Sequence, residues 1–195
     1  MSQRSSAGFS ALELLIVLTI AGCVAAISIP ASANMVDEFR LGGDAQGLSN
    51  SIAQARMGAA ANFTRARLFI DRAANTYRIE RWNKTAAAWQ ADGGTSPLGR
   101  LDTFSTTNVT APPPNSQAAV SQPPACLTSA GATVANSSCV IFNSRGTPVD
   151  SAGAIAATTV IYLRGPTANY AVVVTSTSQL AMWRKAPGAT AWTQK

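Results

Sequence analysis

The feature that most constrains this chain is a continuous apolar segment near its N-terminus. Residues 9–29 hold a single charged side chain, Glu13, and no later stretch of the 195-residue sequence has a comparable run. An α-helix of this length spans about 30 Å, the thickness of the hydrocarbon core of a bilayer. The segment is therefore predicted to be a transmembrane helix.

A secretory signal peptide is the alternative interpretation of the same segment. The small residues around positions 28–33 resemble a signal-peptidase site. However, the apolar run is longer than the core of a typical signal peptide, and Arg4 is the only basic side chain before it. The two interpretations differ in the mature N-terminus that they predict.

Glu13 is an unusual residue for such a helix. A charge near one end of a spanning helix costs on the order of 2–3 kcal/mol unless it is paired or lies near the interface. The carboxylate can reach the lipid headgroups, where the positive end of the helix dipole favours it. Alternatively, it meets a positive partner inside the membrane or an assembly.

The residues around Glu13 resemble the signal of type IV pilins and type II secretion pseudopilins. The resemblance rests on GFSALELLIVL at residues 8–18 and on Pro30. It implies that a prepilin peptidase cuts between Gly8 and Phe9, that Phe9 is then N-methylated, and that Glu13 pairs with the N-terminal amine of a neighbouring subunit. Pro30 matches the proline that bends the pilin helix, and proline does remove one helix hydrogen bond.

The same resemblance implies where the protein acts and with what. It implies a bacterial inner-membrane protein with one span and a periplasmic C-terminal domain, assembled into a pilus or pseudopilus. The implied partners are other pilin or pseudopilin subunits, the prepilin peptidase and the inner membrane. No cofactor is expected.

A helical pattern continues through residues 30–62. Its apolar residues recur mostly at three- and four-residue steps, at Met35, Phe39, Leu48, Ile52, Ala55 and Ala59. Gly42-Gly43 interrupts the pattern, either as a weak point or as a place where the helix can bend. One helix from Ser10 to Asn62 would be about 80 Å long, too long for a compact domain of this size to bury. Its first half is expected in lipid or among other copies, and its second half on a sheet.

The pattern changes to strands after residue 62. Strands are predicted at 66–71, 76–82, 87–90, 138–143, 158–164, 170–175 and 180–185, the first three as an antiparallel meander. Residues 92–122 are rich in Gly, Pro, Ser and Thr and are predicted to be a surface loop with one strand within 101–110. The fold class is therefore α+β: a long N-terminal helix packed on a C-terminal antiparallel β-rich domain. The predicted divisions are a leader (1–8), a membrane and assembly helix (9–29), an amphipathic half (30–62) and a globular domain (63–195).

This layout is similar to GspH/FimT-type minor pilins and pseudopilins. The similarity rests on Gln54-Ala55-Arg56 near the helix end and on the segment at residues 140–146, VIFNSRG. It implies a structural subunit of the initiating or tip complex. Major pilins are an alternative, which the long β-rich tail disfavours.

Two cysteines lie in the predicted globular domain. Cys126 and Cys139 enclose 12 residues, whereas Cys23 lies in the apolar run. In an oxidising compartment a disulfide between them would stabilise the fold by roughly 3 kcal/mol. A metal site is the alternative, but the chain has no histidine and no further cysteine outside the apolar run to complete a tetrahedral site.

Composition argues against an enzyme. The absence of histidine excludes Ser-His-Asp and Cys-His nucleophile systems and the commonest general base. No phosphate-binding glycine loop and no cluster of metal ligands appears. A structural or binding role is therefore predicted.

DNA uptake is the alternative function. Eight basic residues lie between positions 40 and 84, close in sequence to Tyr77, Trp82 and Trp89. Basic and aromatic residues together can bind single-stranded nucleic acid. Alternatively, the basic residues keep the edge of a sheet soluble. Some FimT-like minor pilins bind DNA through a Gly-Arg-x-Arg-like segment near the C-terminus, whose Gly-Arg pair is missing here. The candidate anion-binding residues are Arg65, Arg67, Arg184 and Lys185.

Overall fold

The structure of the protein is a computed structural model that describes residues 10–195, without the side chains of residues 27, 29–31 and 33. The predicted leader, the junction between Gly8 and Phe9, and the Pro30 side chain lie outside the described residues. The chain divides after Val36 into two structural units. Each unit is described by itself.

The first unit contains the start of helix α1 (Ala11–Ala61). The backbone N–H of Glu13 donates to Oγ of Ser10 at 3.3 Å, so Ser10 caps the helix and Glu13 occupies its third position. The large apolar side chains from Leu12 to Val24 are 48–69% exposed. Among the residues that the structure describes, no helix is both long enough and apolar enough to cross a membrane.

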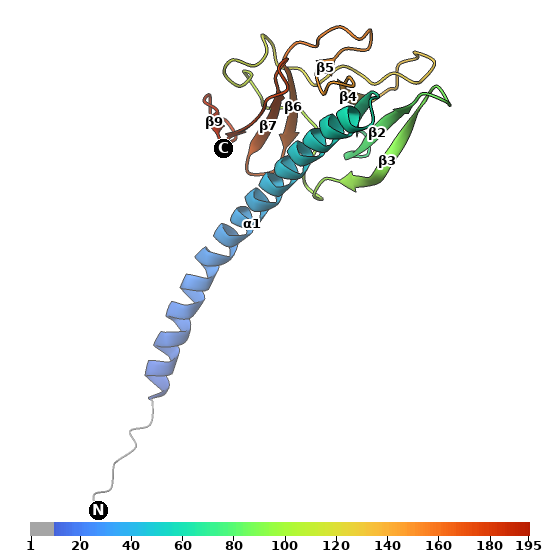
Figure 1. Cartoon of the computed structure of the whole chain (residues 1–195). Coiled ribbons are helices and arrows are strands. Elements are labelled where there is room, and N and C mark those ends of the chain that lie inside the picture. Colours follow the sequence, from blue (N-terminus) through green and yellow to red (C-terminus); the bar gives the residue numbers. More distant parts are fainter. Residues whose placement is uncertain (1–9) are drawn as a thin grey trace, which may run out of the picture. The chain divides into compact units, whose positions relative to one another are not determined.

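The second unit joins the remainder of α1 to two antiparallel sheets (Figure 1). Sheet A has the strand order β3-β2-β1-β4-β5, and sheet B has the order β6-β7-β8-β9. The strands are β1 (Ala66–Asp71), β2 (Thr76–Asn83), β3 (Ala88–Pro97), β4 (Ser137–Phe142), β5 (Pro148–Val149), β6 (Thr159–Arg164), β7 (Asn169–Val174), β8 (Leu180–Lys185) and β9 (Thr193–Gln194). The predicted α+β class is confirmed.

One stripe of α1 packs on both sheets. Its members recur at alternating four- and three-residue steps, which keeps them on one helix face: Leu41, Ala45, Leu48, Ile52, Ala55 and Ala59. They share a core with Leu68 and Phe142 of sheet A and with Ile161 of sheet B. The prediction that Phe39 and Met35 belong to this stripe is wrong. These side chains are 73% and 62% exposed, because neither continues the stripe that begins at Leu41.

Two glycines of α1 make room for tyrosines. A Cβ at Gly42 would lie 3.3 Å from the hydroxyl oxygen of Tyr170, and a Cβ at Gly47 would lie 3.1 Å from that of Tyr77. Burial raises the pKa of both tyrosines. The helix runs on without interruption through Gly42-Gly43, and Gly42 leaves room there for Tyr170.

The seven predicted strands correspond to the seven long strands of the structure. The predicted end of the third strand at Gln90 is wrong. β3 continues to Pro97, and its register slips opposite Arg78 and Glu80, where Gly93 has a φ of 106° that favours glycine. The strand predicted within 101–110 is absent, because only Thr103 of that segment forms a bridge, to Arg164. The two-residue strands β5 and β9 are too short to show an alternating pattern.

The predicted disulfide is confirmed. Cys126 and Cys139 are bonded, with Cα atoms 5.0 Å apart, and they pack with Phe69 on the face of sheet A that is turned away from α1. The bond joins β4 to the loop that precedes it. Backbone N–H groups add to this link, since Cys139 donates to the carbonyl of Pro124 at 2.8 Å and Cys126 donates to Oγ of Ser137 at 2.9 Å.

Two carboxyl groups meet between α1 and the loop after β3. Asp102 is buried, and the N–H of Gly99 donates to Oδ2 of Asp44 at 2.6 Å. A Cβ at Gly99 would approach carboxylate oxygens of both acids, at 2.8 Å and 3.3 Å. Burial, followed by the hydrogen bond and the negative charge of Asp44, raises the pKa of Asp102 to about 7. The contact between the loop and the helix thus depends on protonation of Asp102 beside Asp44.

Removal of the disulfide is expected to destabilise the second unit. Replacing Cys126 and Cys139 together by Ala should lower the free energy of unfolding by roughly 3 kcal/mol, because the unfolded chain regains the entropy of the open loop. Denaturant unfolding of the full chain, followed by tryptophan fluorescence, measures this change. Cys23→Ser is the control and should leave the midpoint unchanged, since Cys23 is an exposed free thiol. An unchanged midpoint in the double variant would contradict a stabilising role.

Asp102→Asn is expected to flatten the pH dependence of stability. The folded pKa of about 7 lies above the unfolded value of 3.8, so the contribution of protonated Asp102 is complete below the unfolded value and is lost as the pH rises through 7. Between about pH 4 and pH 8, the Tm of the wild type should fall, and that of the variant should fall less.

Asp150→Asn is the matched control for this experiment. Asp150 lies in an exposed turn, where its Oδ1 accepts from the N–H groups of Ala152 and Ala154. This variant is expected to shift Tm without changing its slope against pH. A wild-type Tm that stays level through neutral pH would show that Asp102 titrates normally.

Candidate functional site

The largest concentration of functional side chains lies on the outer face of sheet A, opposite α1. Side chains alternate along a strand, so Leu68 and Ile79 face the helix while their neighbours face outward. The outward set consists of cationic, aromatic and acidic residues: Arg65, Arg67, Phe69, Arg78, Glu80, Trp82 and Trp89. We call this set the arginine–tryptophan face.

Arg67 is the buried centre of this face. Its side chain is 5% exposed and that of Glu80 is 7% exposed, and Nε of Arg67 donates to Oε2 of Glu80 at 2.6 Å. Nη1 donates to the backbone carbonyl of Leu127 at 2.7 Å, and the guanidinium lies 4.2 Å from the ring centroid of Trp89. Burial lowers the pKa of Arg67, and the charge of Glu80 opposes that shift. The chain itself therefore satisfies this guanidinium.

Arg78 uses the second oxygen of the same carboxylate. Its Nε donates to Oε1 of Glu80 at 2.8 Å, and its guanidinium lies 4.1 Å from the ring centroid of Phe69. Glu80 thus pairs with two arginines, one through each carboxylate oxygen. Such charge-assisted bonds are the stronger class of protein hydrogen bond.

Arg65 belongs to the same face but has a different environment. Its guanidinium lies 4.8 Å from the ring centroid of Trp82 and 5.7 Å from that of Trp89. The two indoles meet edge to face, with centroids 5.3 Å apart and planes at 73°. Within the part of the chain that the structure describes, no carboxylate forms an ion pair with Arg65.

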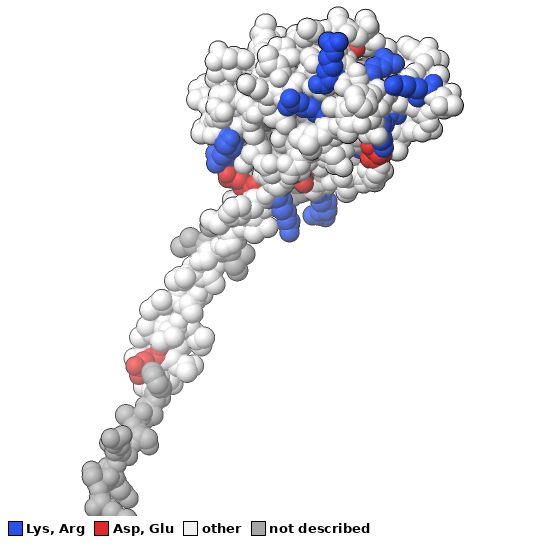
Figure 2. All heavy atoms as spheres, viewed as in Figure 1, with Lys and Arg blue, Asp and Glu red and all other residues white. Residues whose placement is uncertain are grey.

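The other two candidate cations lie on β8 of sheet B and have internal partners. Nε of Arg184 lies 2.7 Å from Oε1 of Glu38. Lys185 is 1% exposed, and its Nζ donates to Oγ1 of Thr110 at 3.0 Å. The structure therefore brings Arg65 and Arg67 together but does not join them to Arg184 and Lys185. On the face shown in Figure 2, Lys and Arg side chains form separate groups with neutral surface between them.

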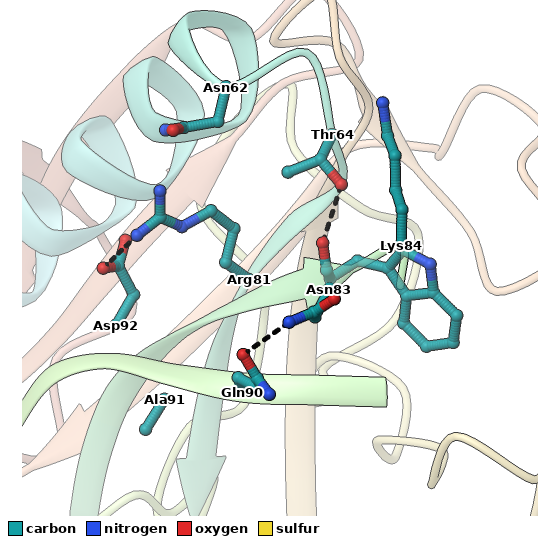
Figure 3. A pocket seen from close by; sticks show the side chains of 9 residues that line it. Asn62, Thr64, Arg81, Asn83, Lys84, Gln90, Ala91 and Asp92 are labelled. Carbon is teal, nitrogen blue, oxygen red and sulfur yellow. Dashed lines mark hydrogen bonds and ion pairs between the residues drawn. The ribbon is translucent and has the colours of Figure 1, made fainter. Parts of the chain in front are cut away.

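A small polar pocket lies beside the end of α1 (Figure 3). The helix ends where Phe63 adopts a φ of 48°, which turns the chain toward β1. The pocket has a volume of about 330 Å³ and is lined by Asn62, Thr64, Lys84, and residues of β2 and β3. Its polar groups bond one another: Arg81 pairs with Asp92, and Nδ2 of Asn83 donates to Oε1 of Gln90 at 3.0 Å. Mutual pairing leaves this pocket few groups for chemistry.

The remaining sequence predictions concern assembly. Glu13 is exposed in the first turns of α1, where its backbone N–H is capped. Within the described residues, no group of three or more Cys, Asp and Glu side chains could hold a metal ion. Sequence reasoning missed the buried Arg67–Glu80 pair, although the facing positions of Arg67 and Glu80 on adjacent strands follow once their register is known.

Comparisons with known proteins find similarity to solved structures alone. No family model matches the sequence, and no curated protein matches it. Two solved structures of the minor pseudopilin EpsH from the type 2 secretion system of Vibrio cholerae are similar to it at 12% identity. One gives a TM-score of 0.45 over 74% of this chain and 95% of that chain, and the other gives 0.46 over 79% and 98%. The chain is thus similar in structure to a minor pseudopilin.

Proposed function

We propose that the protein is a minor pilin or pseudopilin, a structural subunit of a type IV pilus or a type II secretion pseudopilus. It acts in the initiating or tip complex. Residues 9–29 anchor it in the bacterial inner membrane before assembly, and residues 63–195 form its periplasmic domain. Its partners are other subunits of the same class and the prepilin peptidase.

One observation carries this proposal: the first turns of α1 expose an apolar surface. Eight large apolar side chains between Leu12 and Val24 are at least 48% exposed. Burying one such side chain contributes about 1.5–3 kcal/mol, so leaving all eight in water is strongly unfavourable. Lipid covers this surface in the unassembled subunit, and apolar helices of neighbouring subunits cover it in a filament.

The β domain supports a structural role. Several of its charged side chains pair with one another, as in the Arg67–Glu80 pair and the Arg184–Glu38 pair. The four cations considered for DNA binding do not form one surface, and Lys185 is buried. DNA uptake therefore has less support than filament assembly.

The processed N-terminus tests the proposal most directly. Mass spectrometry of the protein from its native host is expected to show a mature chain that begins at Phe9 with a methylated amine. The reason is the Gly8-Phe9 junction directly before the apolar helix. A mature chain beginning after Ala31 or Ala33 would mean cleavage by signal peptidase and would remove the assembly helix, which would overturn the proposal.

Glu13→Ala is expected to impair filament incorporation and to leave the folded domain intact. A carboxylate among apolar helices needs a positive partner, and the new amine of Phe9 on a neighbouring subunit supplies one. Immunoblotting of sheared filaments measures incorporation, and thermal unfolding measures the domain.

Ser10→Ala is the matched control for Glu13→Ala. It removes the hydroxyl that caps the Glu13 N–H and keeps the carboxylate. If the cap were the only role of this turn, Ser10→Ala would impair incorporation and Glu13→Ala, which keeps the capped backbone N–H, would not. Normal incorporation of the Glu13→Ala chain would show that the carboxylate has no part in assembly.

A further inference from the structure

We propose that Arg65 anchors an interaction surface that binds a carboxylate side chain of a neighbouring filament subunit. The surface consists of Arg65, Trp82, Trp89 and the nearby Lys84. The inference rests on the proposed function, because a filament subunit has such neighbours. It assigns a contact to the β domain, in addition to the packing of α1.

The charges of the arginine–tryptophan face are unbalanced. Three guanidiniums, those of Arg65, Arg67 and Arg78, lie on one sheet face with the single carboxylate of Glu80. Glu80 uses one oxygen for Arg67 and the other for Arg78. Both of its oxygens thus bond other arginines, and among the described residues no carboxylate forms an ion pair with Arg65.

The position of Arg65 suits a carboxylate. Its guanidinium lies against two indoles, at 4.8 Å and 5.7 Å from their centroids. Aromatic contact leaves the planar N–H edges of an arginine available, and these edges match both oxygens of a carboxylate. Arg65 is half-buried, so water screens such a pair less than it screens an exposed one.

The chain holds this surface rigid before any partner arrives. Trp82 and Trp89 face each other in register on β2 and β3. The backbone N–H of Trp89 donates to Oγ of Ser129 at 3.1 Å, and Arg67 supports the ring of Trp89 from within the sheet face. Ser129 belongs to the loop that the disulfide fixes to β4. Rigid Trp and Arg side chains are the residue types that dominate binding energy at protein interfaces, because little entropy is lost on binding.

The surface fits a protein carboxylate better than a nucleic acid. Nucleic-acid binding without sequence preference uses a row of cations along the phosphate backbone. Around Arg65, however, Arg67 and Arg78 are bound to Glu80, and Arg81 is paired with Asp92. Among the described residues that line the pocket with Trp82, Lys84 is the cation without an ion pair, and two cations are too few for a strand of phosphates.

In-cell photo-crosslinking of the full chain tests the proposal. The photoreactive residue p-benzoyl-phenylalanine replaces Ala86, an exposed residue in the turn between β2 and β3. In the native host it should give a crosslinked product with another pilin-like subunit, identified by mass spectrometry. Arg65→Glu should reduce this product about tenfold or more, since a charge-assisted contact is lost. Arg65→Gln, which removes the charge without reversing it, should reduce it in the same direction.

Controls separate this contact from the proposed function. Arg72→Glu reverses an exposed cation in the turn between β1 and β2 and should leave the product unchanged. The same photoreactive residue at Leu18 should give crosslinks between helices in the wild type and in Arg65→Glu alike. Absence of the Leu18 crosslink in the wild type would overturn filament assembly itself. A Leu18 crosslink that is intact in both chains would show that Arg65→Glu affects only the contact at Ala86.

A charge reversal on the neighbouring subunit completes the experiment. Once the crosslink identifies an acidic residue of the neighbour, its replacement by Arg should restore the product in the Arg65→Glu chain. Equal crosslinking by the wild type and both Arg65 variants would overturn the proposal. So would a wild-type product at Ala86 that contains nucleic acid in place of protein.

Discussion

The second structural unit depends on the packing of one helix stripe against two separate sheets. Leu41 to Ala59 recur at alternating steps of four and three residues, and their side chains enter a core that both sheets share. The sheets have no common strand, and the stripe of α1 packs into the core that both of them share. Gly42 and Gly47 bring the helix backbone close to Tyr170 and Tyr77, one tyrosine from each sheet. A side chain at either glycine would require the tyrosine beside it to shift by a few tenths of an ångström.

Because α1 covers one face of sheet A, the opposite face needs a different cover. The chain supplies it with the loop before β4, which the disulfide between Cys126 and Cys139 fixes in place. This loop offers the carbonyl of Leu127 to Arg67 and the hydroxyl of Ser129 to Trp89. Loss of the disulfide would therefore loosen the partners of Arg67 and Trp89 as well as the loop itself.

Helices and strands could be predicted where their residue pattern is local and repeated along the chain. The helix and the long strands follow from periods of 3.6 and 2 residues, and the disulfide follows because the globular domain has two cysteines only. The meeting of Asp44 with Asp102 could not be predicted, because the residues are 58 positions apart and no local pattern relates them. β3 was predicted too short, since Gly93-Gly94 normally indicates a loop and here forms a bulge within the strand.

Arg65 and Arg67 show why site residues are harder to predict than elements. The two are two residues apart, they point to the same face, and each contacts Trp89. Their sequence neighbourhoods are almost alike, yet Arg67 lies opposite Glu80 and under the loop, while Arg65 lies opposite Trp82 beyond that cover. The register of β1 against β2 decides which guanidinium is used to hold the fold together. If that register shifted by two residues, Glu80 would lie opposite Arg65 in place of Arg67. The strand pairing that stabilises sheet A therefore also determines which arginine remains available to a partner.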